Sequence, residues 1–464
     1  MTLQAHNRPA TLPQQGRTIV VGLGRTGLSC ARYLQSRGIS FAVTDSRAAP
    51  PESAALQQLA PDADTAFGGF DERLLEGASE IVVSPGVSLR EPFMVSAAAR
   101  GISIVGDIEL FARDARAPIA AVTGTNGKST VTTLVARMAE ASGLSVLAGG
   151  NLGRPALDLL QEPVPQLYVL ELSSFQLDTT QSLHCAAATV LNVTPDHMDR
   201  YVTLHEYAAS KARIFNRCDA AILNMDDVAV RTMPIQSPRV LGFSLVKDPT
   251  AQFYATEHHG AKRVVNGNNH DVALMHLDER VALMSELKIA GLHNAANALA
   301  SLAMADALKL PQAACVQALR EFPGLPHRSQ WVADVAGVLY VDDSKGTNVG
   351  ATLAAVAGMP GSLVLIAGGQ GKGQDFAPLA DAFRGKVRHV VLLGQDAQQI
   401  ADVLRGICTM EFARDMHEAV RMSARAAQSG ETVLLSPACA SLDMFRDYAQ
   451  RGDVFATAVR GLNA

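Results

Sequence analysis

The sequence predicts an α/β fold divided into three domains, each built on a mainly parallel sheet. The chain has 464 residues, enough for roughly three domains of about 150 residues each. Through most of it, short apolar runs that end in Gly, Asp or Ser alternate with helical patterns, as in successive βαβ units. Hydrophobic residues make up 48% of the chain and charged residues 18%, so sizeable buried cores are possible. We place the domains at residues 1–106, 107–324 and 325–464.

Composition and charge exclude several classes of protein. The formal net charge of −5 gives no general attraction to nucleic acid or to anionic lipid, so neither is expected as a partner. The six cysteines form no CxxC pair, which argues against a zinc site or a disulfide framework and suits a reducing compartment. No run approaches the ~18 apolar residues that a membrane span needs, and the polar N-terminal segment lacks a signal-peptide core. We therefore expect a cytoplasmic protein.

The N-terminal domain opens with a glycine-rich turn, VVGLGRTGLS at 20–29. Gly22, Gly24 and Gly27 satisfy the pattern GxGxxG, and Asp45 ends the next expected strand, where it is placed to meet ribose hydroxyls. This fingerprint predicts a Rossmann-like domain with a nucleotide-bearing ligand. The motif alone does not separate NAD from other such ligands, and the same glycines also suit tight packing of a strand against a helix. Strands are expected at 18–22, 41–45 and 80–86.

The central domain carries a second glycine-rich loop, AVTGTNGKST at 121–130. A strand before it and a helix that begins near Ser129 gather backbone N–H groups at the positive end of the helix dipole. Lys128 can reach the β- and γ-phosphates of a nucleotide, and Ser129 or Thr130 can offer a hydroxyl to Mg²⁺. The standard pattern GxxxxGK[ST] has a glycine where this chain has Val122, so the loop is a shortened relative. It predicts a domain like those of P-loop ATPases; the alternative is a tight turn with a solvated lysine.

Polar side chains follow the next strands of the central domain. Glu171 ends the apolar run LYVLE, where an acidic group could reach a magnesium ion held by ATP, or could simply face solvent. The segment TPDHMD then brings His197 between Asp196 and Asp199. A lone histidine in a loop is more often structural, but a cluster at a strand end beside a phosphate loop is a better functional candidate. Lys211 is by itself one basic residue on a helix and carries no argument from the pattern alone.

The C-terminal domain has three polar segments at the ends of expected strands: DDSKGTN at 342–348, GQGKG at 369–373 and SPACASLDMF at 436–445. Open α/β sheets bind ligands at the carboxyl ends of their strands, so we expect these segments to converge on one site. Each could instead be a helix cap, Ser441 in particular.

The remaining segments complete the predicted organisation. The stretch between about 250 and 290 is broken by Gly and Asn and favours antiparallel hairpins. GLPHR at 324–328 is a candidate hinge between the central and C-terminal domains. Further strands are expected at 118–124, 167–171, 188–193, 338–343, 362–369, 389–394 and 432–437.

Taken in order, the motifs TGTNGKST, LELSSFQL, NVTPDHMDRY, LPHR, DDSKGTN and SPACASLDMF resemble those of the Mur ligases. The likeness runs from VVGLGRTGLS to beyond Tyr448, and within the family it is strongest to the members that add D-glutamate. It implies that the N-terminal domain holds the uridine diphosphate end of a substrate rather than NAD, and that the central loop holds ATP. The implied partners are UDP-N-acetylmuramoyl-L-alanine and D-glutamate, and the implied cofactors are ATP and Mg²⁺, with two ions. The C-terminal domain is then a second Rossmann-like domain, and a monomer is expected.

The resemblance also implies a reaction. A carboxylate is a poor electrophile at neutral pH, so ATP phosphorylates the substrate carboxylate to an acyl phosphate. The amino group of D-glutamate then displaces phosphate through a tetrahedral intermediate, which leaves an amide, ADP and phosphate. Three charged reactants have to be held together, which is a task for positioning and electrostatics.

The family's functional positions carry over motif by motif. The residues implied in the reaction itself are Lys128, Glu171, His197, Lys211 and Lys345. Those implied in ATP binding are Gly124, Thr125, Asn126, Gly127, Lys128, Ser129, Thr130, Asn294, Arg328 and Asp343. Those implied for the UDP substrate are Thr26, Asp45, Arg47, Ser84, Asn151 and His197, and those for D-glutamate are Thr347, Lys372, Ser441, Leu442 and Tyr448. The implied magnesium ligands are Ser129, Glu171, His197 and, if carbamylated to an anionic oxygen ligand, Lys211.

One departure and several alternatives stay open. After LPHR the family often has an apolar residue and then a glutamate, whereas Ser329 and Gln330 follow here, which puts an ionic role at position 330 in doubt. The nearest alternative is a sister ligase with a different amino-acid acceptor, although no DNPR-like element is present. An NAD-linked dehydrogenase would leave the central loop unused. A non-catalytic module would bind ATP without turnover.

Overall fold

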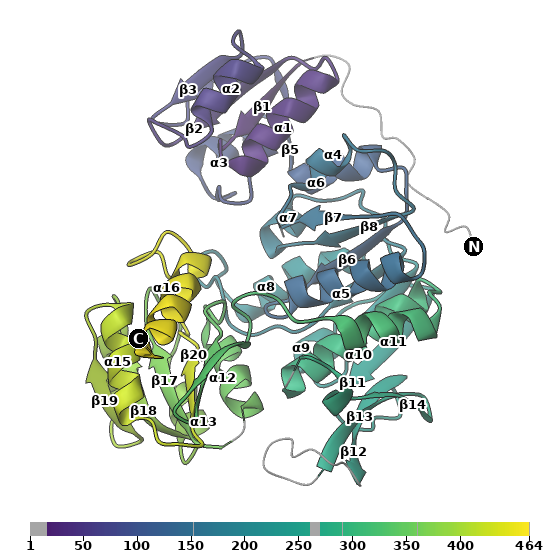
Figure 1. Cartoon of the computed structure of the whole chain (residues 1–464). Coiled ribbons are helices and arrows are strands. Elements are labelled where there is room, and N and C mark those ends of the chain that lie inside the picture. The colour runs from purple at the N-terminus through teal and green to yellow at the C-terminus, as the bar shows by residue number, and fades with distance from the viewer. Residues whose placement is uncertain (1–15, 152, 260–269, 290, 360, 464) are drawn as a thin grey trace.

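The computed structural model describes residues 16–151, 153–259, 270–289, 291–359 and 361–463 (Figure 1). They form three α/β units in chain order, each with its own sheet, which confirms the predicted fold class. Residues 1–15, to which the sequence assigns no role, lie outside the described part, as do residues 260–269 of the predicted hairpins. Within the described ranges, no helix combines the length and the apolarity needed to cross a membrane.

The N-terminal unit is a five-stranded parallel sheet in the order β3-β2-β1-β4-β5. The first glycine-rich turn joins β1 to α1, as the fingerprint predicts. Gly27 has no room for a side chain, because a Cβ there would lie 1.9 Å from the backbone oxygen of Gly22. The close contact seats α1 on the sheet. The elements are β1 (Arg17–Val21), α1 (Arg25–Ser36), β2 (Phe41–Asp45), α2 (Ser53–Leu59), β3 (Asp64–Phe67), β4 (Ala78–Val83), α3 (Pro92–Ala99) and β5 (Ser103–Val105).

The central unit has a nine-stranded sheet in the order β14-β13-β12-β11-β10-β9-β6-β8-β7. It is parallel from β7 through β12 and antiparallel where β13 pairs with β12 and β14, which confirms the predicted hairpins for the described part of that region. The elements are α4 (Asp107–Asp114), β6 (Ile119–Thr123), α5 (Lys128–Ala141), β7 (Val146–Gly150), α6 (Ala156–Leu159), β8 (Leu167–Glu171), α7 (Ser174–Asp178), β9 (Ala187–Val190), α8 (Leu204–Ala212), β10 (Ala220–Asn224), α9 (Val228–Arg231), β11 (Arg239–Ser244), β12 (Phe253–His259), β13 (His270–His276), β14 (Glu279–Leu283), α10 (Leu292–Ala307) and α11 (Gln312–Glu321).

The C-terminal unit has a six-stranded sheet in the order β15-β16-β20-β17-β18-β19, in which β15 is the antiparallel strand. All four strands predicted for this unit are present. The elements are β15 (Gln330–Val335), β16 (Val338–Asp342), α12 (Val349–Gly358), β17 (Leu363–Ala367), α13 (Pro378–Phe383), β18 (Val387–Leu392), α14 (Ala397–Val403), β19 (Thr409–Phe412), α15 (Met416–Ala426), β20 (Thr432–Leu435) and α16 (Tyr448–Arg460).

Buried strands supply side chains to two cores, one on each face of their sheet. In β6, Ile119 and Ala121 enter one core and Ala120 and Val122 the other. Burial on both faces explains why these strands read as continuous apolar runs rather than as alternating patterns. One of the two cores extends into the N-terminal unit, where it includes Leu34 of α1.

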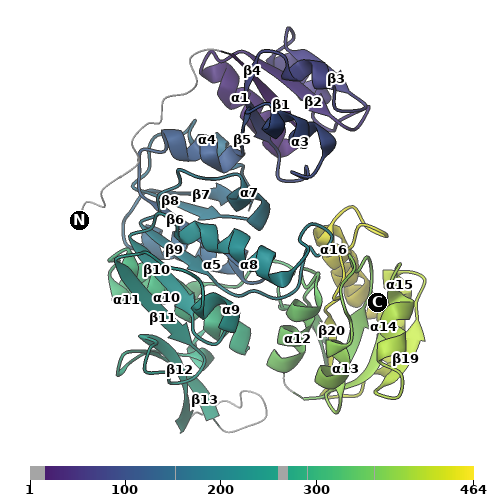
Figure 2. The same ribbon diagram turned by 180° about the vertical axis from the view of Figure 1, so that it is seen from behind.

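The three units lie around the central sheet. The N-terminal unit is at one end of the central unit, and the C-terminal unit lies beside it, with α12 against α10 (Figures 1 and 2). The domain boundaries near residues 106 and 324 stay a prediction. The first of them is not sharp, because α4, which follows it, packs in the core that the first two units share. The arrangement leaves two junctions, and both hold the candidate site residues.

Candidate active site

The phosphate loop lies where β6 ends and α5 begins, at the carboxyl edge of the central sheet. Gly127, at the N-cap of α5, has the left-handed φ of 85° that favours glycine. Lys128 Nζ donates to the backbone oxygens of Gly124 and Thr125, both at 2.9 Å. Lys211 Nζ, from α8, donates to the Gly124 oxygen at 3.0 Å. Two lysines from separate helices therefore converge on one loop.

Four cations surround the loop: Lys128, Lys211, Arg328 and Lys345. Burial lowers the pKa of each, and for Lys345 burial, followed by the Arg328 charge, lowers the pKa to about 7. Lys211 is only 1% exposed, and its pKa lies well below the ordinary lysine value. Arg328 Nη2 reaches across the junction from the C-terminal side and donates to Ser129 Oγ at 2.8 Å. A cluster of this kind is electrostatically suited to a polyanion such as a polyphosphate.

A carboxylate and an imidazole stand beside these cations. Glu171 Oε1, at the end of β8, accepts a hydrogen bond from Asn151 Nδ2 at 2.6 Å, while the buried Oε2 has no partner among the described residues. Burial lowers the pKa of His197, so its ring is neutral near pH 7. No three His, Cys, Asp or Glu side chains in the described ranges form a complete metal site. An ion beside Glu171 would therefore need further oxygens from phosphate or from Ser129, which is the usual way in which Mg²⁺ is bound with a nucleotide.

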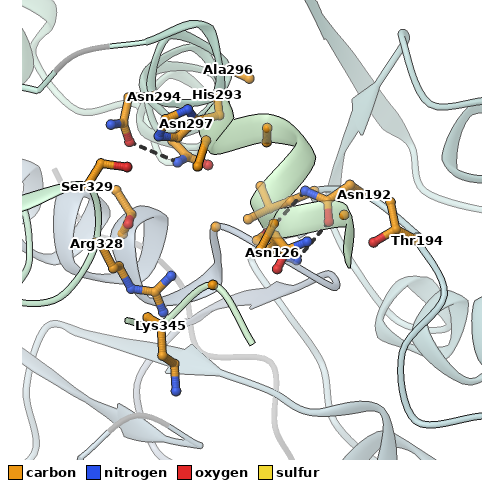
Figure 3. A pocket seen from close by; sticks show the side chains of 18 of the residues that line it. Asn126, Asn192, Thr194, His293, Asn294, Ala296, Asn297, Arg328, Ser329 and Lys345 are labelled. Atoms are coloured by element: carbon orange, nitrogen blue, oxygen red, sulfur yellow. Dashed lines mark hydrogen bonds between the residues drawn. The ribbon is translucent and has the colours of Figure 1, made fainter. Parts of the chain in front are cut away.

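A cavity of about 250 Å³ opens beside the phosphate loop, between the central and C-terminal units (Figure 3). Asn126 and Asn192 lie on one side of it and Arg328 and Lys345 on the other, with the start of α10 between them (Figure 3). The predicted ATP residues that line the cavity are Asn126, Gly127, Thr130, Asn294, Arg328 and Asp343. The other predicted ATP residues belong to the phosphate loop and take part in its hydrogen bonds: Gly124, Thr125, Lys128 and Ser129.

Several residues that line this cavity were not predicted from the sequence: Asn192, Thr194, His293 and Asn297. Asn192 holds the phosphate loop, since its Oδ1 accepts from Asn126 N–H at 2.8 Å and its Nδ2 donates to the Asn126 oxygen at 3.1 Å. Asn297 stands three positions after Asn294 on α10, so helical spacing alone could have placed both amides on one face. Nothing in the local sequence links Asn192 to the loop.

A second cavity, of about 570 Å³, lies between the N-terminal and central units. Five of the six residues predicted for the UDP substrate line it, namely Thr26, Asp45, Arg47, Ser84 and Asn151. Asp45 accepts from Leu23 N–H at 2.7 Å, and the hydrogen bonds from Arg47 lower the pKa of Asp45 to about 2. The sixth, His197, does not line this cavity; it lies near enough to Lys128 and Lys211 for their charges to lower its pKa. Asn151 links the two places, because it lines this cavity and also holds Glu171.

The three C-terminal segments come together at the carboxyl edge of their sheet. Gln370 and Ala440 exchange two backbone hydrogen bonds of 2.9 Å, and buried Arg451 donates to the backbone oxygens of Ser344 and Cys439 at 2.8 and 3.1 Å. Lys345 Nζ lies 3.6 Å from the centre of the Tyr448 ring.

The residues predicted for D-glutamate stand around this meeting point in different environments. Ser441 is buried and Leu442 is 65% exposed. Thr347 N–H donates to the Lys345 oxygen at 2.8 Å. Lys372 has a φ of 55°. Burial is the main cause of the lowered pKa of Lys345, followed by the charges of Arg328 and Lys128, and the charge of Lys372 lowers this pKa by a smaller amount.

One alternative from the sequence is wrong: Ser441 does not cap a helix, because α16 begins later and its N-cap is Asp447, whose side chain accepts from Gln450 N–H. At position 330, where the sequence departs from the family pattern, the Gln330 side chain makes a neutral contact, since its Oε1 accepts from His327 N–H at 3.0 Å.

Fold and site together define a nucleotide-binding α/β protein, with a phosphate loop at one domain junction and a separate ligand cavity at the other. Comparison with known proteins narrows this class. Residues 16–106 match the Mur ligase MurD-like N-terminal domain, residues 122–305 the Mur ligase middle domain, and residues 327–439 the Mur ligase glutamate ligase domain. The chain belongs to the Mur ligase family, and is thus an ATP-dependent enzyme that forms amide bonds.

Individual relatives agree over nearly the whole chain. It is 50% identical to a UDP-N-acetylmuramoylalanine–D-glutamate ligase from Nitrosococcus oceani, with 98% of each chain covered. It is 47% identical to the protein of that name from Marinobacter nauticus, with 96% of this chain and 98% of the relative covered. Among solved structures, UDP-N-acetylmuramate–alanine ligase from Thermotoga maritima has a TM-score of 0.60 at 18% identity, over 96% of this chain and all of that one, which shows the shared fold.

Proposed function

We propose that this protein joins D-glutamate to UDP-N-acetylmuramoyl-L-alanine, with hydrolysis of ATP to ADP and phosphate. The observation that carries the proposal is identity of 45–50% over nearly full length to several proteins with that name. The geometry supports it, because a cavity for each nucleotide-bearing substrate lies at its own domain junction. The carboxylate end of the muramoyl substrate then has to reach the phosphate loop.

The cations around the phosphate loop have a direct role in this reaction. Phosphoryl transfer from ATP to the substrate carboxylate breaks the bond between the β,γ-bridging oxygen and the γ-phosphorus, and ADP leaves. A carboxylate oxygen bonds to the same phosphorus to form an acyl phosphate, with charge on the phosphoryl oxygens. Lys128, Arg328 and Lys345 surround that position and can neutralise the charge without rearrangement of solvent. The amine of D-glutamate then adds to the acyl carbon, and phosphate leaves from the tetrahedral intermediate as the amine loses its proton.

Magnesium fits the donors that surround the loop. Glu171 has a buried oxygen with no partner in the described part, and the neutral ring of His197 and the Ser129 hydroxyl lie on the adjoining segments. When bound, the ions would neutralise phosphate oxygens of the nucleotide. Lys211 fits the same site as a carbamate, since burial favours its neutral amine, the form that adds to carbon dioxide with loss of one proton.

D-glutamate is assigned to the C-terminal unit. Lys372 supplies a cation for a carboxylate, and Ser441 and Thr347 stand on the neighbouring loops. The site of attack then lies between Lys345 and the phosphate loop, where the C-terminal and central units meet.

Product identification tests the proposal. Purified protein is incubated with UDP-N-acetylmuramoyl-L-alanine, ATP, Mg²⁺ and one amino acid at a time, and the nucleotide products are separated and analysed by mass spectrometry. We expect a product that has gained one glutamate residue with D-glutamate only. A product with another amino acid, and none with D-glutamate, would support a ligase activity but contradict the assignment of D-glutamate as the acceptor.

A further inference from the structure

Asn348 connects the C-terminal unit to the nucleotide site by a set of buried hydrogen bonds. It is the N-cap of α12, and its Oδ1 accepts from Ala351 N–H at 2.8 Å. Its Nδ2 crosses the junction and donates to Asp196 Oδ2 at 3.1 Å and to Asn126 Oδ1 at 3.3 Å. Asn126 Nδ2 donates back to Asn348 Oδ1 at 3.4 Å. The side chain is almost fully enclosed, at 2% exposure.

Both partners of Asn348 across the junction belong to segments that form the nucleotide site. Asn126 is in the phosphate loop and lines the cavity beside it. Asp196 precedes His197, and its Oδ1 accepts the His197 backbone N–H at 2.9 Å. A single amide from the C-terminal unit is therefore bonded to the loop expected to hold the phosphates and to the loop that carries His197.

The neighbouring turn of α12 is fitted closely to the same place. A Cβ at Gly350 would lie 2.8 Å from Thr194 Oγ1 and 3.1 Å from Thr194 Cβ, so a side chain there would displace Thr194 or α12. Thr194 itself is hydrogen-bonded to the phosphate loop, since its backbone oxygen accepts from Thr125 Oγ1 at 3.2 Å. The contact therefore depends on shape as well as on hydrogen bonds.

We propose that Asn348 is a positioning residue that latches the C-terminal unit onto the phosphate loop and the His197 loop. Thr347, the adjacent residue, is the expected contact for D-glutamate, so the latch sets the distance between the amine and the phosphorylated carboxylate. The activity readout of this inference rests on the proposed function. Its structural readout, the docking of the C-terminal unit, does not.

Asn348→Asp is the sharpest single change. It keeps the size of the side chain and the Oδ1 that caps α12, but it removes the Nδ2 donor and places a carboxylate against Asp196. We expect kcat/KM for D-glutamate to fall roughly tenfold to a hundredfold, as for a lost hydrogen bond to a buried charged group. With ATP and Mg²⁺ present, the radius of gyration from small-angle scattering should exceed that of the unaltered protein.

Two companions separate a latch from a general loss of structure. Gly350→Ala should open the same junction by steric contact alone and lower kcat/KM for D-glutamate, with binding of UDP to the distant cavity unchanged. Asp415→Asn is the control: it makes the reverse change, from carboxylate to amide, at the N-cap of α15, where the side chain accepts from Glu418 N–H. It should alter neither activity nor radius of gyration.

A double-mutant cycle gives the decisive reading. When Asp196→Asn is added to Asn348→Asp, the amide donor stands at position 196 and the carboxylate acceptor at position 348, so the hydrogen bond can form in the opposite direction. The double variant should recover part of the lost kcat/KM and of the compact radius of gyration. Additive losses in both quantities, or an unchanged radius and unchanged kcat/KM in Asn348→Asp, would overturn the latch. An unaltered protein that does not use D-glutamate would instead reject the proposed function, and the radius would still report on the latch.

Discussion

Lys128 is the residue whose removal should damage the reaction most directly. Its ammonium is held by two carbonyls of its own loop, at the point where the charge of a transferring phosphoryl group would develop. Lys128→Met keeps much of the apolar stem but removes the charge, and we expect a loss on the order of 3 kcal/mol in transition-state stabilisation, as for one preorganised donor to an oxyanion. Steady-state kinetics measure it as a fall in kcat/KM of roughly a hundredfold. Lys247→Met, at an exposed lysine away from the site, is the matched control; equal kinetics for both variants would remove Lys128 from the mechanism.

Nucleotide binding should take up protons. Burial and nearby cations lower the pKa of Lys345 to about 7, so part of the population is neutral in the free protein at pH 8. Phosphate oxygens favour the charged form and raise this pKa again, so binding draws protons from the buffer, and affinity should decline as the pH rises above about 7. Calorimetry of ATP binding at pH 8 in buffers of different ionisation enthalpy reports the uptake. Lys345→Met should reduce it, and heats that are independent of the buffer would contradict the expected shift.

Side chains within a motif could be predicted from the sequence, whereas those that join motifs could not. Lys128 begins α5, Glu171 ends β8 and His197 lies in the loop after β9, as the local pattern indicates. The three lie close enough together in the structure that the charge of Glu171 affects the pKa of Lys128 and the charge of Lys128 affects the pKa of His197. Asn192 and Asn348 act through partners distant in the chain, at contacts that depend on how loops and domains pack. Lys211 is intermediate: the pattern makes it an ordinary helical lysine, and only tertiary burial reveals its unusual environment.

At the scale of elements, the turn from β6 into α5 is the most demanding local structure in the site. Gly127 combines a φ of 85° with an approach so close that a Cβ would lie 2.4 Å from Asn297 Oδ1. Gly127→Ala should therefore lose ATP affinity as well as stability, because both the loop conformation and an amide on the cavity wall are disturbed. Thermal unfolding and nucleotide titration measure the two effects separately.

The same helix provides the control for this substitution. Gly143, just after α5, has a φ of 84°, but a Cβ added there would meet no atom within 4 Å. Gly143→Ala should cost about 1 kcal/mol of stability from backbone strain, with ATP affinity unchanged. If both substitutions affect ATP equally, the close contact with Asn297 has no role in binding.

Element types were easier to predict than their ends. The predicted strand at 188–193 stops at Val190 in the structure, because the following residues turn toward the phosphate loop and exchange hydrogen bonds with it. Ser441 has the chemistry of a helix cap, yet it is buried at the start of an exposed turn that precedes the true cap, Asp447. Long-range contacts thus override local preference at the functional edges, where the loops serve a ligand rather than the helix they lead to.

At the scale of the whole molecule, the two cavities should act as separate binding sites. Arg47 lines the cavity between the N-terminal and central units and belongs to no part of the phosphate-loop cavity. Arg47→Ala should raise KM for the UDP substrate roughly tenfold through loss of a charged contact, while KM for ATP stays within about twofold. A rise in KM for ATP of similar size would show that the two junctions are not independent.

Both junctions and the C-terminal loops are expected to serve one reaction. The measurement that tests this most directly is phosphate release from ATP and Mg²⁺, with each combination of UDP-N-acetylmuramoyl-L-alanine, D-glutamate and L-glutamate. We expect rapid release only when the UDP substrate and D-glutamate are both present, with one phosphate formed for each amide. Release that needs neither of them, or that proceeds equally with L-glutamate, would contradict it.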